Sequence, residues 1–252
     1  MKKTFFVLLT IFFCALSAAT QTTDNDDVQF WHETQLTFPV LKKKDDAGKS
    51  VEKLNFFLVG NLRAGRNFRD FVDERIGAGF DYKFNRNVSF APSYLYVASQ
   101  PARGTKQFES RLRLAVTLEN KWKKFSLRDR NLVEFRFRNN ASNSTRYRNR
   151  LTFQYPILKK NKEEIIAPYA ANEIYYDFTD RRVSRNETSF GVSRKISANV
   201  GADFYYLLRV NRGAALRYVH VIGFNLKIKV DNLFRSEEPA GNRAQNSFPL
   251  FP

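Results

Sequence analysis

Apolar and polar residues alternate over long stretches of this chain, and the clearest stretch covers residues 125–155. In its first half, Phe and Leu residues fall on one parity and arginines on the other. A polar segment, residues 139–144, leads into a second half with the same alternation. A repeat of two residues is typical of β-strands, and two such runs joined by a polar turn predict an antiparallel hairpin.

The same alternation predicts strands over most of the remaining chain, and no helical period appears. With the hairpin there are about eleven segments, although closed bacterial barrels normally have an even number of strands. We therefore expect 10 or 12 strands, with one segment split or spurious. Pro92 cannot donate to a ladder and is expected to mark a bulge, and the inward Gly77 and Gly79 are expected to let the sheet bend. The further strand segments are 28–38, 54–64, 69–84, 88–98, 108–118, 165–178, 185–195, 200–210 and 216–230.

The apolar parity of these segments is rich in aromatic residues, which are 15% of the chain, with 25 Phe and 11 Tyr. A continuous surface of this kind is larger than soluble proteins expose, and the chain predicts no helix to cover it. Each run is long enough for a tilted strand to cross a bilayer, which takes about 9–11 residues. We predict an all-β, antiparallel transmembrane-type β-barrel over residues 28–234. The alternative is a soluble periplasmic β-sandwich that binds a polyanionic ligand.

The N-terminus has the features of a signal peptide, predicted as residues 1–19. Lys2 and Lys3 precede an apolar run, and small residues at 17–19 offer a cleavage site. The run is shorter than the roughly 20 residues of a spanning helix, so we expect export to the outer membrane. Residues 20–27 are expected to be a lead-in and residues 235–252 a polar C-terminal tail.

Histidine and cysteine are scarce, which bears on metal sites and catalysis. Cys14 is the one cysteine and lies in the predicted signal peptide, and His32 and His220 are the two histidines. We expect neither a disulfide nor a metal site, no cofactor and no enzymatic activity. A catalytic reading would need a nucleophile beside a base. Ser89, Ser93 and Ser193 share the polar parity, but nothing in the pattern pairs them with a histidine.

Three segments resemble a known family. They are QFWHETQLTFP at residues 29–39, RYRNRLTFQYP at 146–156 and APYAANEIYYDF at 167–178. They are similar to the bacterial exported family catalogued as domain of unknown function 2490, over about residues 28–230. The resemblance implies an outer-membrane-type β-barrel and brings no activity or catalytic residues. Residues 223–228 look like the closing strand of such barrels, but the tail that follows them departs from that pattern.

The polar parity is dominated by arginine, with glutamates interspersed. One interpretation is structural, because Arg and Glu on neighbouring strands pair and fill a narrow lumen. The other is a narrow pore whose positive lining favours anions. The expected partners are outer-membrane lipid, the barrel-assembly machinery and small anions, with no nucleic acid despite a net charge of +17. The predicted lumen-lining residues are Arg111, Arg113, Arg128, Arg130, Arg136, Arg138, Arg146, Arg148, Arg150, Glu109, Glu134 and Glu173, and parity adds Arg63, Arg75, Glu33, Glu74 and Glu187.

Overall fold

The computed structural model describes residues 26–44, 48, 50–100, 105–158, 164–214 and 216–230. The predicted signal peptide with Cys14 and the predicted C-terminal tail lie outside the described residues. Every regular element in the described part of the chain is a β-strand. No helix among these residues is long and apolar enough to cross a membrane.

The structure has twelve strands, and eleven of them overlap the predicted segments. The short strand β8 falls where the sequence predicts a turn after residue 155. Each long strand alternates between buried and more exposed side chains. The strands are β1 (Asp26–Lys44), β2 (Ser50–Gly65), β3 (Asp70–Lys83), β4 (Val88–Ser99), β5 (Gln107–Lys121), β6 (Ser126–Arg138), β7 (Ser144–Gln154), β8 (Ile157–Leu158), β9 (Glu164–Asp177), β10 (Arg182–Lys195), β11 (Val200–Asn211) and β12 (Tyr218–Lys229).

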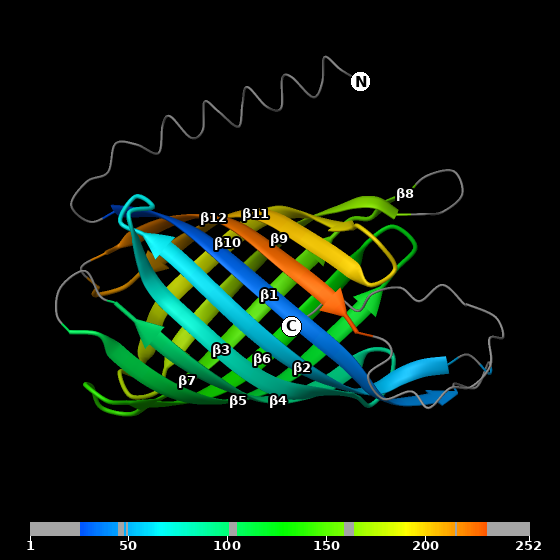
Figure 1. Ribbon diagram of the computed structural model, residues 1–252, viewed down its shortest axis with the longest axis horizontal. Helices are drawn as coiled ribbons and strands as arrows, with labels where there is room; N and C mark the ends of the chain where they lie inside the picture. Colours follow the sequence, from blue (N-terminus) through cyan, green and yellow to red (C-terminus); the bar gives the residue numbers. More distant parts are fainter. Residues whose placement is uncertain are drawn as a thin grey trace, which may run out of the picture.

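The strands form one sheet that closes on itself as a barrel of tilted strands (Figure 1). Each long strand pairs with the next along the chain, and β12 returns to pair with β1. Strand β8 continues β7 beyond Pro156 in the same register on β9, since Gln154 is opposite Tyr169 and Ile157 is opposite Ile166. The closed wall therefore contains eleven strands. The predicted all-β barrel is confirmed, and a closed single sheet excludes the two-sheet sandwich.

One pairing differs from the antiparallel prediction. The strands β1 and β12 run parallel, in register from Asp26 opposite Tyr218 to Thr37 opposite Lys229. In a wall of up-and-down strands, an odd number places the first and last strands in the same direction. The expected twelve strands are reached because the seventh is split at Pro156 into β7 and β8. None of the eleven predicted segments is spurious, because all belong to the wall and a parallel seam accommodates the odd number.

Aromatic and aliphatic side chains cover the outside of the barrel, whereas charged side chains are buried inside it. Leu112 on the outer face is 49% exposed, whereas Glu134 on the inner face is 0% exposed. Two local predictions are wrong. Glu74 lies on the outer face, opposite Leu62. Pro92 causes no register shift, because β4 stays in register with β5 through it. On the β3 side the pairing is simply interrupted beside it, as expected for a residue without an N–H.

Part of the interior is packed like a conventional core. Trp31, Leu207, Val219 and Val221 form a buried cluster with Tyr205 against it. Strand β12 has room for the Tyr205 ring because Gly223 lies directly beneath it, and a Cβ at that position would overlap the ring. Glycine on the inner face thus makes space for a large neighbouring side chain, a role that the expectation of simple sheet bending at glycines did not include.

Candidate functional site: the arginine-lined lumen

Strands β5, β6 and β7 supply most of the arginines inside the barrel, and we call their inner face the arginine wall. The inward residues of adjacent strands lie opposite one another, as with Arg113, Glu134 and Arg146. These side chains converge because alternate residues of a strand point to the same face. The local sequence, with nine arginines at inward positions of these three strands, therefore builds a dense layer of guanidinium groups.

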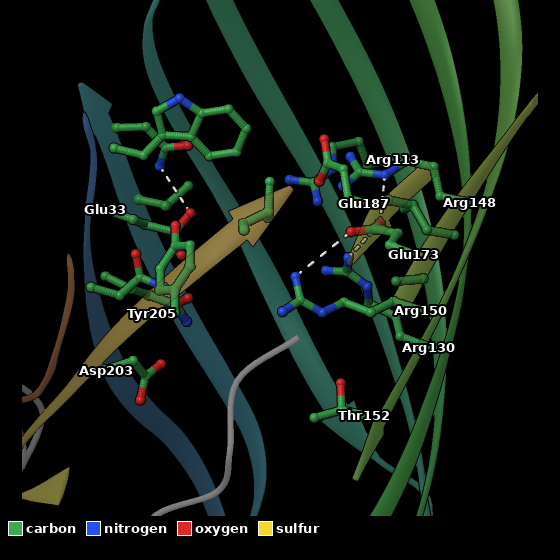
Figure 2. A pocket seen from close by; sticks show the side chains of 18 of the residues that line it. Glu33, Arg113, Arg130, Arg148, Arg150, Thr152, Glu173, Glu187, Asp203 and Tyr205 are labelled. Atoms are coloured by element: carbon green, nitrogen blue, oxygen red, sulfur yellow. Dashed lines mark hydrogen bonds and ion pairs between the residues drawn. The ribbon is translucent and has the colours of Figure 1, made fainter. Parts of the chain in front are cut away.

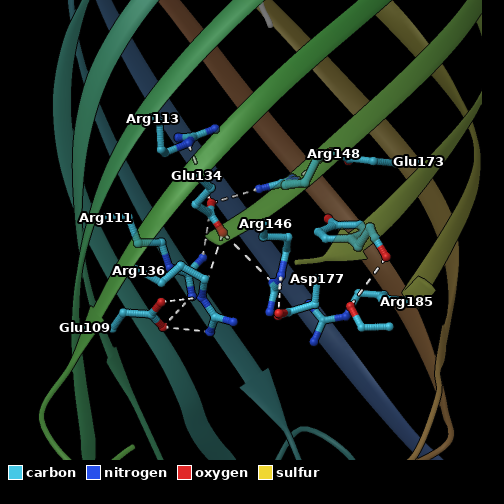
Figure 3. Close-up of polar contacts among 12 residues, drawn as sticks. Glu109, Arg111, Arg113, Glu134, Arg136, Arg146, Arg148, Glu173, Asp177 and Arg185 are labelled. Atoms are coloured by element: carbon cyan, nitrogen blue, oxygen red, sulfur yellow. Dashed lines mark hydrogen bonds and ion pairs between the residues drawn. The ribbon is translucent and has the colours of Figure 1, made fainter. Parts of the chain in front are cut away.

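Glu134 is the centre of this layer and is fully buried. Five arginines have a nitrogen within 4.0 Å of its carboxylate (Figure 3). The shortest of these distances, to Arg148, is 3.4 Å. One carboxylate is therefore shared among several cations rather than bonded tightly to one. The other four arginines are Arg111 at 3.7 Å, Arg113 at 3.9 Å, Arg146 at 3.9 Å and Arg136 at 4.0 Å.

Two of the five arginines also bind Glu109 near the start of β5. Arg111 Nη2 donates to Glu109 Oε2 at 2.9 Å, and Arg136 Nη2 donates to the same oxygen at 3.0 Å. Arg136 Nε makes a further bond to Glu109 Oε1. Two donors from one guanidinium give a bidentate pair, which fixes its orientation. Glu109 thus holds Arg136 against the wall.

Glu173 on β9 and Glu187 on β10 extend the network around the barrel. Arg130 and Arg148 donate to Glu173 Oε1 at 2.9 and 2.8 Å (Figure 2). Glu187 accepts hydrogen bonds from Arg209 Nε at 2.8 Å and the Tyr175 hydroxyl at 2.9 Å. Arg148 links the arginines around Glu134 to those around Glu173, since it contacts both carboxylates.

Two aromatic rings support arginines inside the lumen. The guanidinium of Arg148 lies 4.5 Å from the centre of the Tyr175 ring. The Trp31 ring has Arg63 at 3.6 Å and Arg209 at 4.3 Å from its centre. Such cation–π contacts stabilise a guanidinium without neutralising its charge.

A cavity of about 230 Å³ remains between these side chains. Among the residues that the structure describes, its lining contains eleven arginines and Lys227 but four carboxylates. In Figure 2, Glu33 and Tyr205 lie across from Arg148, Arg150 and Glu173. The lining therefore carries a strong excess of positive charge, which favours anions. The four acidic residues are Glu33, Glu173, Glu187 and Asp203.

The predicted site residues divide into two groups in the structure. Glu109, Glu134, Arg136 and Arg138 do not line the cavity: the first three lie in the network behind it, and Arg138 donates to the Ser142 carbonyl beside the β6–β7 turn. The residues that do line it are Arg111, Arg113, Arg128, Arg130, Arg146, Arg148, Arg150 and Glu173, together with Arg63, Arg75, Glu33 and Glu187.

Several lining residues were not among the predicted ones. Arg185, Arg209 and Tyr175 have the inward parity, so the alternation contained the signal that could have identified them. Trp31 shares the polar parity of Glu33 and Gln35, and Tyr205 that of Asp203 and Arg209, so parity also places these two aromatic side chains inside.

The two histidines lie away from the lumen. His220 accepts from or donates to the Tyr206 hydroxyl at 2.7 Å, and His32 contacts the Phe224 carbonyl and Thr34. Ser93 and Ser193 line the cavity instead, so the barrel wall separates these hydroxyls from both imidazoles. No group of three or more potential ligands gathers as a metal site within the described ranges.

Comparison with known proteins gives a family and two distant structural likenesses. The family model described as "Protein of unknown function (DUF2490)" matches residues 28–219. The β domain of the Bordetella autotransporter BrkA is similar at 12% identity and a TM-score of 0.47, covering 68% of this chain and 82% of that one. The NanC porin is similar at 11% identity and a TM-score of 0.47, covering 81% and 99%. No curated protein matches the chain.

Proposed function

The chain belongs to this family of unknown function, and we propose that it is an outer-membrane β-barrel whose lumen admits small anions. The lipid-facing surface is supported by the uncovered ring of exposed Leu, Phe and Tyr side chains around a closed sheet. The lumen role rests on one observation, the excess of twelve basic over four acidic residues in the cavity lining.

Internal pairing does not account for all of these arginines. Arg113 Nε lies 3.9 Å from a carboxylate oxygen of Glu134. Four other arginines contact the same carboxylate. Arg150 approaches Glu173 at 3.7 Å, and its side chain is 31% exposed. A small anion bound between these guanidinium groups would supply the missing acceptors. The proposal needs outer-membrane lipid and the barrel-assembly machinery as partners, and it involves no nucleic acid, cofactor or catalytic step.

Reconstitution in planar bilayers tests the lumen role. The wild-type protein is expected to show a reversal potential that favours anions in a salt gradient. Replacing Arg113 and Arg150 by Gln should reduce that preference severalfold, because the local potential that concentrates anions falls. Arg136, an attractive target by parity, is a poor choice since it does not line the cavity and is held by Glu109.

Arg138→Gln is the matched control, since Arg138 is an arginine of the same wall that lies outside the cavity lining. Its selectivity should equal that of the wild type. An unchanged reversal potential in the double variant, or the absence of conductance in the wild type, would contradict anion passage. In the latter case the paired arginines and glutamates would have the structural role of filling the lumen.

Trp fluorescence provides a second readout that does not require conduction. Trp31 lines the cavity, while Trp122 lies beyond β5 and stacks on Phe125. In a Trp122→Phe background, iodide should quench Trp31 more strongly than caesium does. Equal quenching by both ions would argue against a positive lumen. Membrane location is tested by cell fractionation and by heated and unheated electrophoresis, because a closed sheet resists detergent until it is boiled.

A further inference from the structure

The outer surface of the barrel carries polar side chains on β6 and β7, where lipid-facing residues are expected. Asp129, Asn131 and Asn149 alternate with inward arginines and therefore point outward. Asn149 Nδ2 donates to Asp129 Oδ1 at 2.6 Å and to Asn131 Oδ1 at 3.1 Å. Asn131 Nδ2 donates to Asp129 Oδ2 at 3.1 Å, and the Tyr147 hydroxyl donates to Asn131. These four side chains form one network.

A second network lies on β9 and β10. Asn172 Nδ2 donates to Asn186 Oδ1 at 3.1 Å and to Thr188 Oγ1 at 2.9 Å. Asn186 Nδ2 donates back to Asn172 Oδ1 at 3.2 Å. The strands β6, β7, β9 and β10 are neighbours in the sheet, so the two networks lie side by side on the barrel, and we call them together the polar band. The polar band consists of Asp129, Asn131, Tyr147, Asn149, Asn172, Asn186 and Thr188.

The polar band crosses the middle of its strands. Asn149 is the central residue of β7, and Asn131 and Thr188 lie close to the centres of β6 and β10. In a barrel that spans a bilayer, this level is the hydrocarbon core, where no water is present to hydrogen-bond them. A carboxylate such as Asp129 is unfavourable against lipid there. The outer faces of β2 to β5 at the same level are apolar instead, with residues such as Leu58, Tyr94, Leu112 and Leu114.

Beside the polar band, the small residue Ala170 on β9 is flanked by two large ones on the outer face. Ala170 lies opposite Phe153 on β7 and opposite Phe190 on β10. These two phenylalanines are 45% and 59% exposed, so a small residue forms a floor between two projecting rings. Small residues let neighbouring proteins approach closely within a membrane.

We propose that the polar band and the surface around Ala170 form the contact between two copies of this chain in the membrane. The band has the complementarity that a two-fold contact requires. Its β6–β7 half contains an acceptor-only carboxylate, Asp129, and its β9–β10 half contains Asn186, whose amide donates one bond within the network and has a second N–H for the partner. A two-fold axis between β7 and β9 places the first half of one copy opposite the second half of its partner, so that each contact occurs twice. Phe153 of each copy, on β7, then faces Ala170 on β9 of the other copy.

The contact is tested by cysteine cross-linking in native outer membranes. In a Cys14→Ser background, Ala170→Cys places a thiol beside the proposed axis, and mild oxidation should give a covalent dimer. Leu114→Cys, on the apolar outer face of β5, is the matched control and should remain monomeric. Equal cross-linking of both variants would indicate random collision and overturn the proposal, as would cross-linking of Ala170→Cys to a different protein alone.

A further variant tests the polar band itself. Asn186→Leu removes the hydrogen bond to Asp129 of the other copy, which occurs twice in the dimer, and leaves a side chain that lipid accepts, so the barrel should keep its heat-dependent electrophoretic shift. Its dimerisation in lipid vesicles, counted by single-molecule photobleaching, should weaken by about tenfold, which corresponds to the loss of two membrane hydrogen bonds. A wild-type protein that is monomeric in vesicles, or a variant that dimerises normally, would overturn the proposal.

This inference rests on the proposed membrane location but not on anion passage. Release of the protein into the soluble fraction removes the membrane location and the dimer together. A barrel without conductance that still cross-links through Ala170→Cys retains the dimer. Conductance from a protein that does not cross-link retains the function and overturns the dimer alone.

Discussion

The arginine wall and the strands opposite it solve the problem of filling a barrel in different ways. In a ring of eleven strands, β6 lies opposite the seam between β12 and β1, and we call the inner face of β12, β1 and β2 the seam wall. The arginine wall is filled by guanidinium groups that share buried carboxylates. The middle of the seam wall is filled by Trp31, Phe57, Val219 and Val221, with amide side chains between them. One interior therefore contains a charged surface and a largely neutral one.

The two walls have different sources of stability. On the seam wall, apolar burial and close packing stabilise the fold, and Val221 is 0% exposed. On the arginine wall, each buried carboxylate compensates the desolvation of several guanidinium groups. The arginine wall should therefore be sensitive to loss of charge, and the seam wall to changes in volume. The excess of cations on one side also predicts that an anion in the cavity lies against the arginine wall.

The largest effect is expected from removing the shared carboxylate of the arginine wall. Glu134→Gln leaves five arginines around a neutral amide, and breaking a buried charge network of this kind costs about 3–5 kcal/mol. The free energy of unfolding, measured by urea titration of the refolded barrel in lipid, should fall by that amount. If anions enter the lumen, added chloride or sulfate should recover part of the loss.

Glu33→Gln is the matched control on the seam wall. The hydrogen bond of Glu33 is with Asn61 Nδ2 at 3.1 Å, and a glutamine oxygen accepts it equally well. The expected change is below about 1.5 kcal/mol, the net value of one hydrogen bond. Equal losses in the two variants would remove the energetic distinction between the walls.

The fold was predictable because a period of two residues fixes which side chains share a face. All eleven wall strands follow from alternation alone, as does the inward position of Arg113 and Arg148. The seam was not predictable, since pairing of β1 with β12 joins the two ends of the barrel and leaves no local pattern. Strand β8 is two residues long, too short for alternation to reveal.

For the site, the sequence predicted which residues face the lumen but not which of them line the cavity. Parity places Glu134 and Glu173 inside, but whether a carboxylate lines the cavity or lies behind it depends on side-chain contacts between strands. Five arginines contact Glu134 at 3.4 Å or more, whereas Arg136 donates two hydrogen bonds to Glu109. These differences arise from rotamers and register, so the sequence could not separate cavity-lining arginines from those fixed in the wall.

An intermediate effect is expected from changing volume on the seam wall. Gly223→Ala places a methyl group where the Tyr205 ring lies, and overpacking of this kind costs about 1–3 kcal/mol. The same urea titration measures the loss. Gly60→Ala is the matched control, because a Cβ there has no atom within 4 Å, and its effect should be within about 0.5 kcal/mol.

A double variant identifies the cause of that loss. In a Tyr205→Leu background the ring is absent, so Gly223→Ala should cost less than it does in the wild type. Such coupling is the signature of two residues in contact. Additive losses would mean that Gly223 is needed for its backbone and not for the space above it.

The smallest effect on stability is expected from joining the parallel seam covalently. Thr34 on β1 and Leu226 on β12 are register partners, and adjacent strands lie about 4.8 Å apart, within the range of a disulfide. Both residues point outward, so Thr34→Cys with Leu226→Cys in a Cys14→Ser background should leave the free energy of unfolding of the reduced protein nearly unchanged. Oxidation should produce an intramolecular bond, visible as faster migration of the boiled protein.

This cross-link tests the register of β1 on β12. Ile222 lies on the same face of β12 but four residues from Leu226, about 13 Å along the strand, so Thr34→Cys with Ile222→Cys should not cross-link. A wall closed by an even number of strands would have antiparallel neighbours at the seam and would not reproduce the parallel register from Asp26 to Thr37. Cross-linking of the Leu226 pair without the Ile222 pair would therefore support the eleven-strand wall, whereas the reverse result would shift the seam and move Trp31 relative to Val219 and Val221.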